Sequence, residues 1–219
     1  MGETARTRVI IGITAAVWFV VALVSGPEGV AEVSLRAFSL AASVVTILLL
    51  LYEKWLWRWK AVRYFTKKPL LEGTWRGTLK SDYVPPGKSE PVPPIPTVIR
   101  IRQTDTTLFV TQFTSESTST TEQGRLSKEA DGRWRISWLY TNQPRPTIQD
   151  RSAVHRGAAD LWLSGSHGEV LDGGYFTGRK TRGDLLFDEW CSVPFADASS
   201  AFQSLKFVQA HPFVRDDHL

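Results

Sequence analysis

The residues best suited to hold a ligand lie between positions 138 and 182. In this stretch aromatic rings, amides and glycines are interleaved with arginines. Aromatic rings stack on planar bases, and arginines form charge-assisted hydrogen bonds with phosphate. The stretch therefore predicts a site for a small phosphorylated ligand that carries a base. The candidate binding residues are Tyr140, Asn142, Arg145, Arg151, His155, Tyr175 and Arg179.

The same residue types also have a purely structural interpretation. Tryptophan and tyrosine on strands usually belong to a core, glycines often mark bulges, and arginines usually carry surface charge. The residues alone leave both the ligand site and the plain scaffold open.

Catalytic and metal-binding motifs are missing from the sequence. The four histidines show no metal-ligand spacing, and Cys191 alone cannot build a structural zinc site. No GxSxG elbow, Walker loop or strand-borne GxGxxG turn is present. Asp188 and Glu189 would face opposite sides of a strand, so they make a poor acid–base pair. We therefore expect a binding protein that is not an enzyme, with no catalytic residues, no metal ion and no cofactor besides its ligand.

Short strands are the elements that must position these residues. Apolar and polar residues alternate from Gly73 onward, so that Trp134, Ile136, Trp138 and Tyr140 share one face of a strand. Turn residues separate about eight such segments, and none has a long helical period. The pattern favours one antiparallel β-barrel or β-sandwich. The predicted strands are 73–79, 97–102, 108–114, 114–126, 134–140, 152–163, 170–179 and 184–190.

Two segments of this region break the alternation. Residues 84–96 contain six prolines and predict a long surface loop. Residues 196–209 contain Asp197 as an N-cap candidate and predict a short helix that closes one end of the barrel.

The first 68 residues differ from the rest because they contain two long uncharged runs. Val9–Val24 and Ala37–Tyr52 each approach the ~20 residues needed to cross ~30 Å of hydrocarbon. They predict a transmembrane hairpin, with spans at about 9–25 and 37–54, and a basic and aromatic tether that ends at residue 68. A cleaved signal peptide is the alternative for the first run, but no clear small-x-small site follows it and a second run comes at once.

The charge distribution separates the two parts of the chain. Residues 1–68 contain nine Lys/Arg and four Asp/Glu, whereas residues 69–219 contain seventeen and eighteen. Because the β-rich region is not basic, a nucleic-acid polymer is disfavoured as its partner. Lys and Arg flank the two runs and are scarce in the loop between them, so both termini are predicted to be cytoplasmic. The single cysteine suits that reducing compartment.

Several elements resemble the two-transmembrane, β-strand-rich effector family of bacterial cyclic-oligonucleotide anti-phage signalling (CBASS). The resemblance covers nearly the whole chain. Its elements are the two adjacent runs with their basic tether, the opening strand Gly73–Leu79, Tyr140/Asn142/Pro144, His155/Gly157, and Gly174/Phe176/Lys180/Gly183 or, in the neighbouring register, Gly173/Tyr175/Arg179.

This resemblance implies a small antiparallel eight-stranded β-barrel, distantly lipocalin-like, over residues 69–219. It implies that the barrel binds a cyclic dinucleotide made by a partner nucleotidyltransferase. Binding would then promote homo-oligomerisation and disruption of the bacterial inner membrane, which causes abortive infection. Trp75 matches the lipocalin opening motif, in which the tryptophan is structural, so it stays outside the candidate site.

The alternative function is a membrane-tethered barrel that binds lipid or fatty acid and has no effector activity. Such a barrel has an apolar interior with one or two arginines for a carboxylate. Arg145, Arg151, Arg156 and Arg179 all fall near the predicted mouth, which favours a ligand with more than one anionic group. A hydrolase at the membrane is a third class, and the missing nucleophile–base pair argues against it.

Overall fold

The computed structural model describes residues 2–29, 35–165, 169–204 and 206–208. The chain divides into two compact units, residues 1–69 and 70–219.

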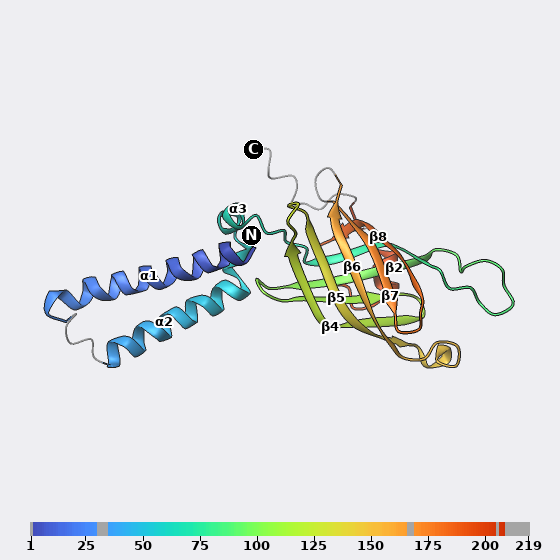
Figure 1. Ribbon diagram of the computed structural model, residues 1–219, viewed down its shortest axis with the longest axis horizontal. Helices are drawn as coiled ribbons and strands as arrows, with labels where there is room; N and C mark the ends of the chain where they lie inside the picture. The colour runs from blue at the N-terminus through green and yellow to red at the C-terminus, as the bar shows by residue number, and fades with distance from the viewer. Residues whose placement is uncertain (1, 30–34, 166–168, 205, 209–219) are drawn as a thin grey trace. The chain divides into compact units, whose positions relative to one another are not determined.

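The first unit is helical. It contains α1 (Gly2–Gly29), α2 (Leu35–Lys54), the 3-10 turn η1 (Leu56–Arg58) and α3 (Lys60–Thr66), and α1 and α2 contact each other (Figure 1). The two predicted spans fall within α1 and α2. Over the residues that the structure describes, no helix is long and apolar enough to cross a membrane.

The predicted tether contains the two short helical elements η1 and α3. Trp57 is buried, and the cationic groups of Arg58 and Lys68 lie 5.8 Å and 5.5 Å from the centre of its ring. Such cation–π contacts hold charged side chains against an aromatic face. The tether therefore folds around one tryptophan, while Trp55 and Trp59 remain exposed.

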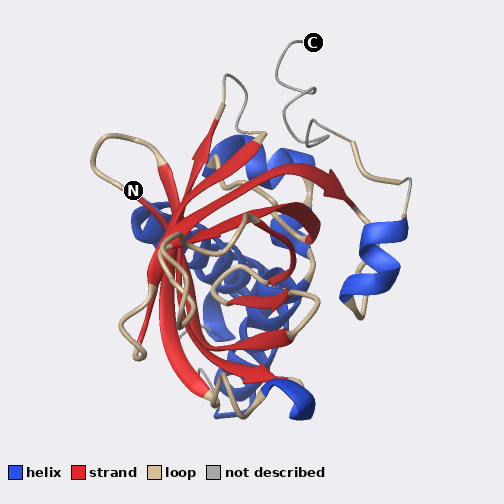
Figure 2. Ribbon diagram, turned by 90° about the vertical axis from the view of Figure 1, so that its right-hand side faces the viewer, coloured by secondary structure: helices blue, strands red, loops and turns tan. Residues whose placement is uncertain are grey.

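The second unit is a closed antiparallel barrel in which each strand pairs with the next and β8 pairs with β1 (Figures 1 and 2). This arrangement confirms the predicted eight-stranded barrel. Its strands are β1 (Gly73–Ser81), β2 (Ile95–Gln103), β3 (Leu108–Phe113), β4 (Ser117–Lys128), β5 (Trp134–Pro144), β6 (His155–Ser164), β7 (Val170–Thr177) and β8 (Arg182–Cys191).

Alternation along each strand decides which side chains fill the barrel. Successive side chains point to opposite faces of a strand, so every second residue faces inward. On β2, Ile99 and Ile101 are fully buried. The next residue, Arg102, points to the opposite face and is exposed. The inward residues form one hydrophobic core that includes Trp75, Ile99, Ile101, Leu108, Val110, Ile136, Leu161, Leu171, Leu185 and Phe187.

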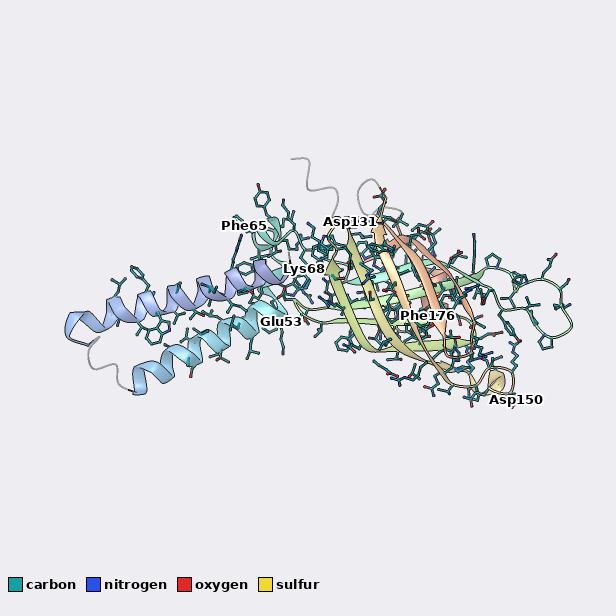
Figure 3. The ribbon with its side chains drawn as sticks, in the orientation of Figure 1. Glu53, Phe65, Lys68, Asp131, Asp150 and Phe176 are labelled. Atoms are coloured by element: carbon teal, nitrogen blue, oxygen red, sulfur yellow. The ribbon has the colours of Figure 1, made fainter. Side chains whose placement is uncertain are left out.

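The barrel has two unlike ends. At one end the chain enters β1, and the indole N–H of Trp75 donates to the carbonyl of Leu71 at 3.0 Å. The amide of Leu71 in turn donates to Oε1 of Gln103 at 2.8 Å, which fastens the entering chain across that end. At the other end, which we call the mouth, β5 finishes and β6 begins. Asp131 and Asp150, labelled in Figure 3, lie in turns at the two opposite ends.

The loop between β1 and β2 confirms the prediction made from its prolines for residues 84–94, whereas Ile95 and Pro96 already belong to β2. It protrudes from the mouth end in Figure 1, and most of its residues are exposed. One hydrogen bond, from the Val92 amide to the carbonyl of Tyr83 at 3.0 Å, ties its two arms together.

The C-terminal segment forms the expected short helix but in a different place. In α4 (Ala198–Gln203), the carboxylate of Asp197 caps the first turn by accepting from the Ser200 amide at 2.8 Å. The helix contacts β1 and β2 from outside, because the outward-facing Arg76 donates to the carbonyls of Phe202 and Ser204 at 3.4 Å. The prediction that this helix closes one end of the barrel is therefore wrong: it lies against the outer wall.

Candidate functional site

The inner wall changes character toward the mouth. Besides the aliphatic Leu79 and Ile95, the inward residues there include neutral polar ones, of which four are buried: Thr97, Gln112, Ser119 and Asn142. They pair with one another across strands. The amide of Gln112 donates to Oγ1 of Thr97 at 3.0 Å, and Ser119 Oγ donates to Oδ1 of Asn142 at 2.9 Å. The mouth half of the barrel is thus lined in part by uncharged hydrogen-bonding groups.

Tyr140 is one of two tyrosines in this lining. It lies on the inward face of β5, is 5 % exposed, and sits opposite Gly157 of β6. A β-carbon at Gly157 would lie 2.5 Å from both Cζ and the hydroxyl oxygen of Tyr140, so the glycine makes room for the ring. Burial, and secondarily the nearby Tyr175, raises the pKa of the Tyr140 hydroxyl, which keeps it a neutral hydrogen-bond donor.

Tyr175 occupies a matching position on β7. Its ring lies over Gly183 of β8, where a β-carbon would lie 2.8 Å from Cε1 of the tyrosine. Burial raises the pKa of the Tyr175 hydroxyl, which also hydrogen-bonds with Ser81. The tyrosine lines a hollow at the mouth together with Lys80, Ser81, Asp82, Arg182, Gly183 and Asp184.

His155 faces inward beside Asn142, its partner in the β5–β6 ladder. Its Nδ1 lies 2.9 Å from the carbonyl oxygen of Ala153. Because a carbonyl can only accept, Nδ1 carries the proton and Nε2 remains available as an acceptor when the ring is neutral. His155 can therefore accept a hydrogen bond at the mouth.

The predicted arginines lie on the connections outside the barrel. Arg151 forms an ion pair of 2.5 Å with Glu116, and Nη1 of Arg179 donates to Oγ of Ser152 at 2.6 Å. Arg145 lines a separate outer groove with Phe113, Thr118 and Asp197. All three arginines are at the mouth end. They lie on the connections between strands and not on the inward faces of the strands.

Arg156 does not face the mouth, contrary to the expectation from its neighbours. It is on the outward face of β6, where it forms an ion pair with Glu122 of β4. The hydrogen bond from Arg156, followed by one from Thr141, holds the pKa of Glu122 below its ordinary value. The side-chain alternation of β6, which turns Gly157 inward, turns Arg156 outward.

The seven predicted residues therefore form two groups at the same end of the barrel. Tyr140, Asn142, His155 and Tyr175 line the inside, and Arg145, Arg151 and Arg179 lie on the surrounding connections. Ligand contact by any of the seven stays a prediction.

Sequence reasoning missed the polar lining contributed by β2, β3 and β4. Thr97, Gln112 and Ser119 face the same space as Asn142 and are equally buried. The alternation of side chains along β3 could have revealed this lining, because Gln112 lies two residues after the buried Val110 and therefore also faces inward. Arg182 at the rim was missed as well; its Nε lies 3.4 Å from a carboxylate oxygen of Asp82.

A closed barrel with an apolar inner half, a polar mouth and cationic connections around that mouth belongs to the small-ligand-binding β-barrels. A family model, described as the Cap15 cyclic dinucleotide receptor domain, matches residues 66–189. The match covers more than half of the 219 residues and contains all seven candidate site residues, so the chain belongs to this family. This membership confirms the resemblance drawn from the sequence.

One curated relative supports the same assignment. The CD-NTase-associated protein 15 of Staphylococcus schleiferi is 26% identical to this chain over 147 residues. The similarity covers 67% of this chain and 75% of the relative. Among the residues that the structure describes, no group of three or more His, Cys, Asp and Glu side chains is placed to hold a metal ion.

Proposed function

We propose that the barrel binds a cyclic dinucleotide at its mouth and that the protein acts as a CBASS effector. The observation that carries this proposal is the pair of mouth tyrosines, the buried Tyr140 and the half-buried Tyr175, each seated over a glycine. Membership of a cyclic dinucleotide receptor family supports it.

The chemistry of such a ligand fits the two groups of residues at the mouth. A cyclic dinucleotide carries two planar bases and two phosphates. Aromatic rings and neutral amides suit the bases, whereas Arg151 and Arg179 on the connections suit the phosphates. Both arginines already bond to neighbouring side chains, so a phosphate would exchange those partners for a stronger, charge-assisted contact.

The fatty-acid alternative fits this lining poorly. An acyl chain needs an apolar tunnel, yet the mouth half presents Thr97, Gln112, Ser119 and Asn142. Thr97, Gln112 and Ser119 already bond to neighbouring groups, but the amide hydrogens of Asn142 would find no acceptor on a hydrocarbon chain, which is costly. A polar, base-bearing ligand satisfies them instead.

We further propose that α1 and α2 attach the barrel to the bacterial inner membrane, with both chain ends in the cytoplasm. The uncharged runs and the Lys/Arg bias support this, as do exposed apolar side chains such as Phe19, Leu23 and Val24. The ligand would come from a partner nucleotidyltransferase. Its binding would bring several copies together and disrupt the membrane, because barrel association raises the local concentration of the attached helices.

The effector would act by binding and assembly rather than by catalysis. Among the described residues of the mouth lining, the buried hydroxyls of Thr97 and Ser119 donate to the carbonyl oxygen of Phe113 and to Oδ1 of Asn142 and not to a general base.

Thermal unfolding of the full-length protein in lipid nanodiscs tests ligand identity. A ligand at 100 times its Kd stabilises the folded state by about 2.7 kcal/mol, and cyclic dinucleotides should do so. Linear dinucleotides and fatty acids serve as comparison ligands. Stabilisation by a fatty acid, with none by any cyclic dinucleotide, would replace the proposal with the lipid-binding alternative.

A further inference from the structure

At the mouth, charged residues and uncharged polar residues occupy different places. In the part of the chain that the structure describes, the inward positions of the mouth half contain no Asp, Glu, Lys or Arg. The cations there are on the rim and connections: Arg145, Arg151, Arg179, Lys180 and Arg182 are all exposed. A charge is costly to bury without a partner, whereas a neutral polar group needs only hydrogen bonds. The inside therefore suits an uncharged part of a ligand.

One strand concentrates unused hydrogen-bond donors on this inner wall. Trp138, Tyr140 and Asn142 take alternate inward positions on β5 and are 3 %, 5 % and 8 % exposed. The indole N–H of Trp138 is buried and has no hydrogen-bond partner. The Tyr140 hydroxyl and the side-chain amide hydrogens of Asn142 donate to no described residue, but unlike the Trp138 indole N–H they are not closed off from solvent. At about 3.4 Å per residue the three groups span about 14 Å from mouth to interior.

An unpaired buried donor is unusual, because most buried polar groups in native structures have a partner. The buried indole N–H of Trp138, which lies below two further donors without a partner among the described residues, therefore indicates acceptors supplied from outside the chain. Nucleobases provide such acceptors as ring nitrogens and exocyclic oxygens, and they are planar and uncharged. Phosphates also accept, but they would lose their hydration inside a barrel that offers no cation.

We propose that the ligand enters base first. One base lies against the inner face of β5, with its acceptors facing the Tyr140 hydroxyl and the Trp138 indole N–H, while the phosphates stay at the rim beside the arginines. This inference rests on the proposed function and adds the orientation of the ligand and Trp138 as its deepest contact. Because Trp138 is nearly fully buried, the side chains above it shift when the base enters.

The indole N–H groups report on this contact directly. The full-length protein, labelled with nitrogen-15 and held in detergent micelles, gives one indole N–H signal for each of its nine tryptophans. Trp138→Phe identifies the signal of interest by its loss. Cyclic di-AMP and cyclic di-GMP are then added separately, with sodium pyrophosphate as the phosphate probe without a base. We expect a cyclic dinucleotide to shift the Trp138 signal and pyrophosphate to leave it in place.

Affinity measurements give an independent reading. Loss of one neutral hydrogen bond weakens binding by about five- to tenfold, which is the effect expected of Trp138→Phe. Trp134→Phe is the matched control, since Trp134 lies on the same strand face at the opposite end of the barrel. Should Trp138→Phe not fold, Tyr140→Phe deletes a single hydroxyl from the same row and carries the same expectation, and the shift in the wild-type protein is still measurable.

Each outcome decides the matter. If a cyclic dinucleotide binds with unchanged affinity in Trp138→Phe and leaves every indole signal in place, base-first entry is wrong although the proposed function survives. If pyrophosphate alone moves the Trp138 signal, the phosphate goes inside and the orientation is reversed. If no cyclic dinucleotide binds at all, the proposed function itself fails.

Discussion

The hydroxyl of Tyr140 on β5 rests against Gly157 on β6, at a position where no other residue type leaves room for the ring. A β-carbon at Gly157 would also lie 2.8 Å from the carbonyl oxygen of Phe176, so neither the ring nor the backbone can simply yield. The glycine is therefore part of the mouth even though it offers no functional group of its own.

Substitution of this glycine should damage the mouth. Gly157→Ala forces the Tyr140 ring out of its seat, and overpacking of this kind costs typically 1–3 kcal/mol of unfolding free energy. We expect that loss in urea unfolding, together with loss of cyclic dinucleotide binding. Gly178→Ala is the control, because its β-carbon would meet its nearest neighbour at an ordinary 3.5 Å. Equal effects of the two substitutions would show that Gly157 has no special role.

The Ser119–Asn142 pair predicts a stability effect without a ligand. Ser119→Ala removes the hydroxyl that donates to Oδ1 of Asn142 and leaves a buried acceptor unpaired, which costs about 1–3 kcal/mol. Chemical denaturation of the full-length protein measures the change. Thr120→Ala, on the exposed outward face of the same strand, should change the unfolding free energy by less than about 0.5 kcal/mol. A neutral Ser119→Ala would mean that another group replaces the lost donor.

The arginines on the connections should affect affinity and not folding. Arg151 is 63 % exposed at its side chain, and exposed ion pairs contribute about 0–1 kcal/mol to stability. A charge-assisted contact with phosphate contributes ~1.5–3 kcal/mol, so Arg151→Ala or Arg179→Ala should weaken binding by roughly 10- to 100-fold. Titration calorimetry measures this. Arg156→Ala on the outer wall should bind like the wild type, and wild-type affinity in all three variants would move the phosphates elsewhere.

The two mouth tyrosines, the buried Tyr140 and the half-buried Tyr175, predict a loss of stability at alkaline pH. Burial raises the pKa of Tyr140 and of Tyr175 in the folded state, so above the ordinary tyrosine value of about 10 the unfolded chain binds fewer protons than the folded one. The free energy of unfolding therefore falls as pH rises through that value. Urea unfolding between about pH 8 and pH 11 measures the slope. Tyr140→Phe should flatten it, and an unchanged slope would assign it to other groups.

Cysteine labelling tests the membrane proposal. In a Cys191→Ser background, Val30→Cys should react with a membrane-impermeant maleimide in intact spheroplasts, whereas Lys88→Cys should react after lysis. Val30 lies outside the described residues, and Lys88 is in the exposed loop between β1 and β2. Reaction of Lys88→Cys in intact spheroplasts would reverse the proposed orientation.

Periodicity along single strands was the most informative property of the sequence. The period of two placed Trp138 and Tyr140 inside and Arg102 outside, because an inward position repeats at every second residue whatever the partner strand is. Asn142, His155 and Tyr175 were found by a different property, the concentration of aromatic, amide and basic residues between positions 138 and 182.

Interactions between distant segments were the part that the sequence did not reveal. The place of α4 depends on contacts of Arg76 with Phe202 and Ser204, more than 120 positions away. The ion pair between Arg156 and Glu122 likewise joins two different strands. Neither contact leaves a local pattern, since both depend on the register between strands.

Barrel closure by β1 and β8 has a consequence for synthesis of the protein. Every other pair of adjacent strands is a hairpin between neighbours in the chain, but β1 meets β8 across a separation of more than 100 residues, as in Thr74 and Cys191. Hairpins of this kind can form while the chain is still being translated, whereas the distant pairing is entropically costly and slow. Until the ribosome has released Cys191, the nascent sheet has two open edges, which invite intermolecular pairing and aggregation. A chain interrupted before β8 would therefore be a hazard for its cell rather than a weaker receptor.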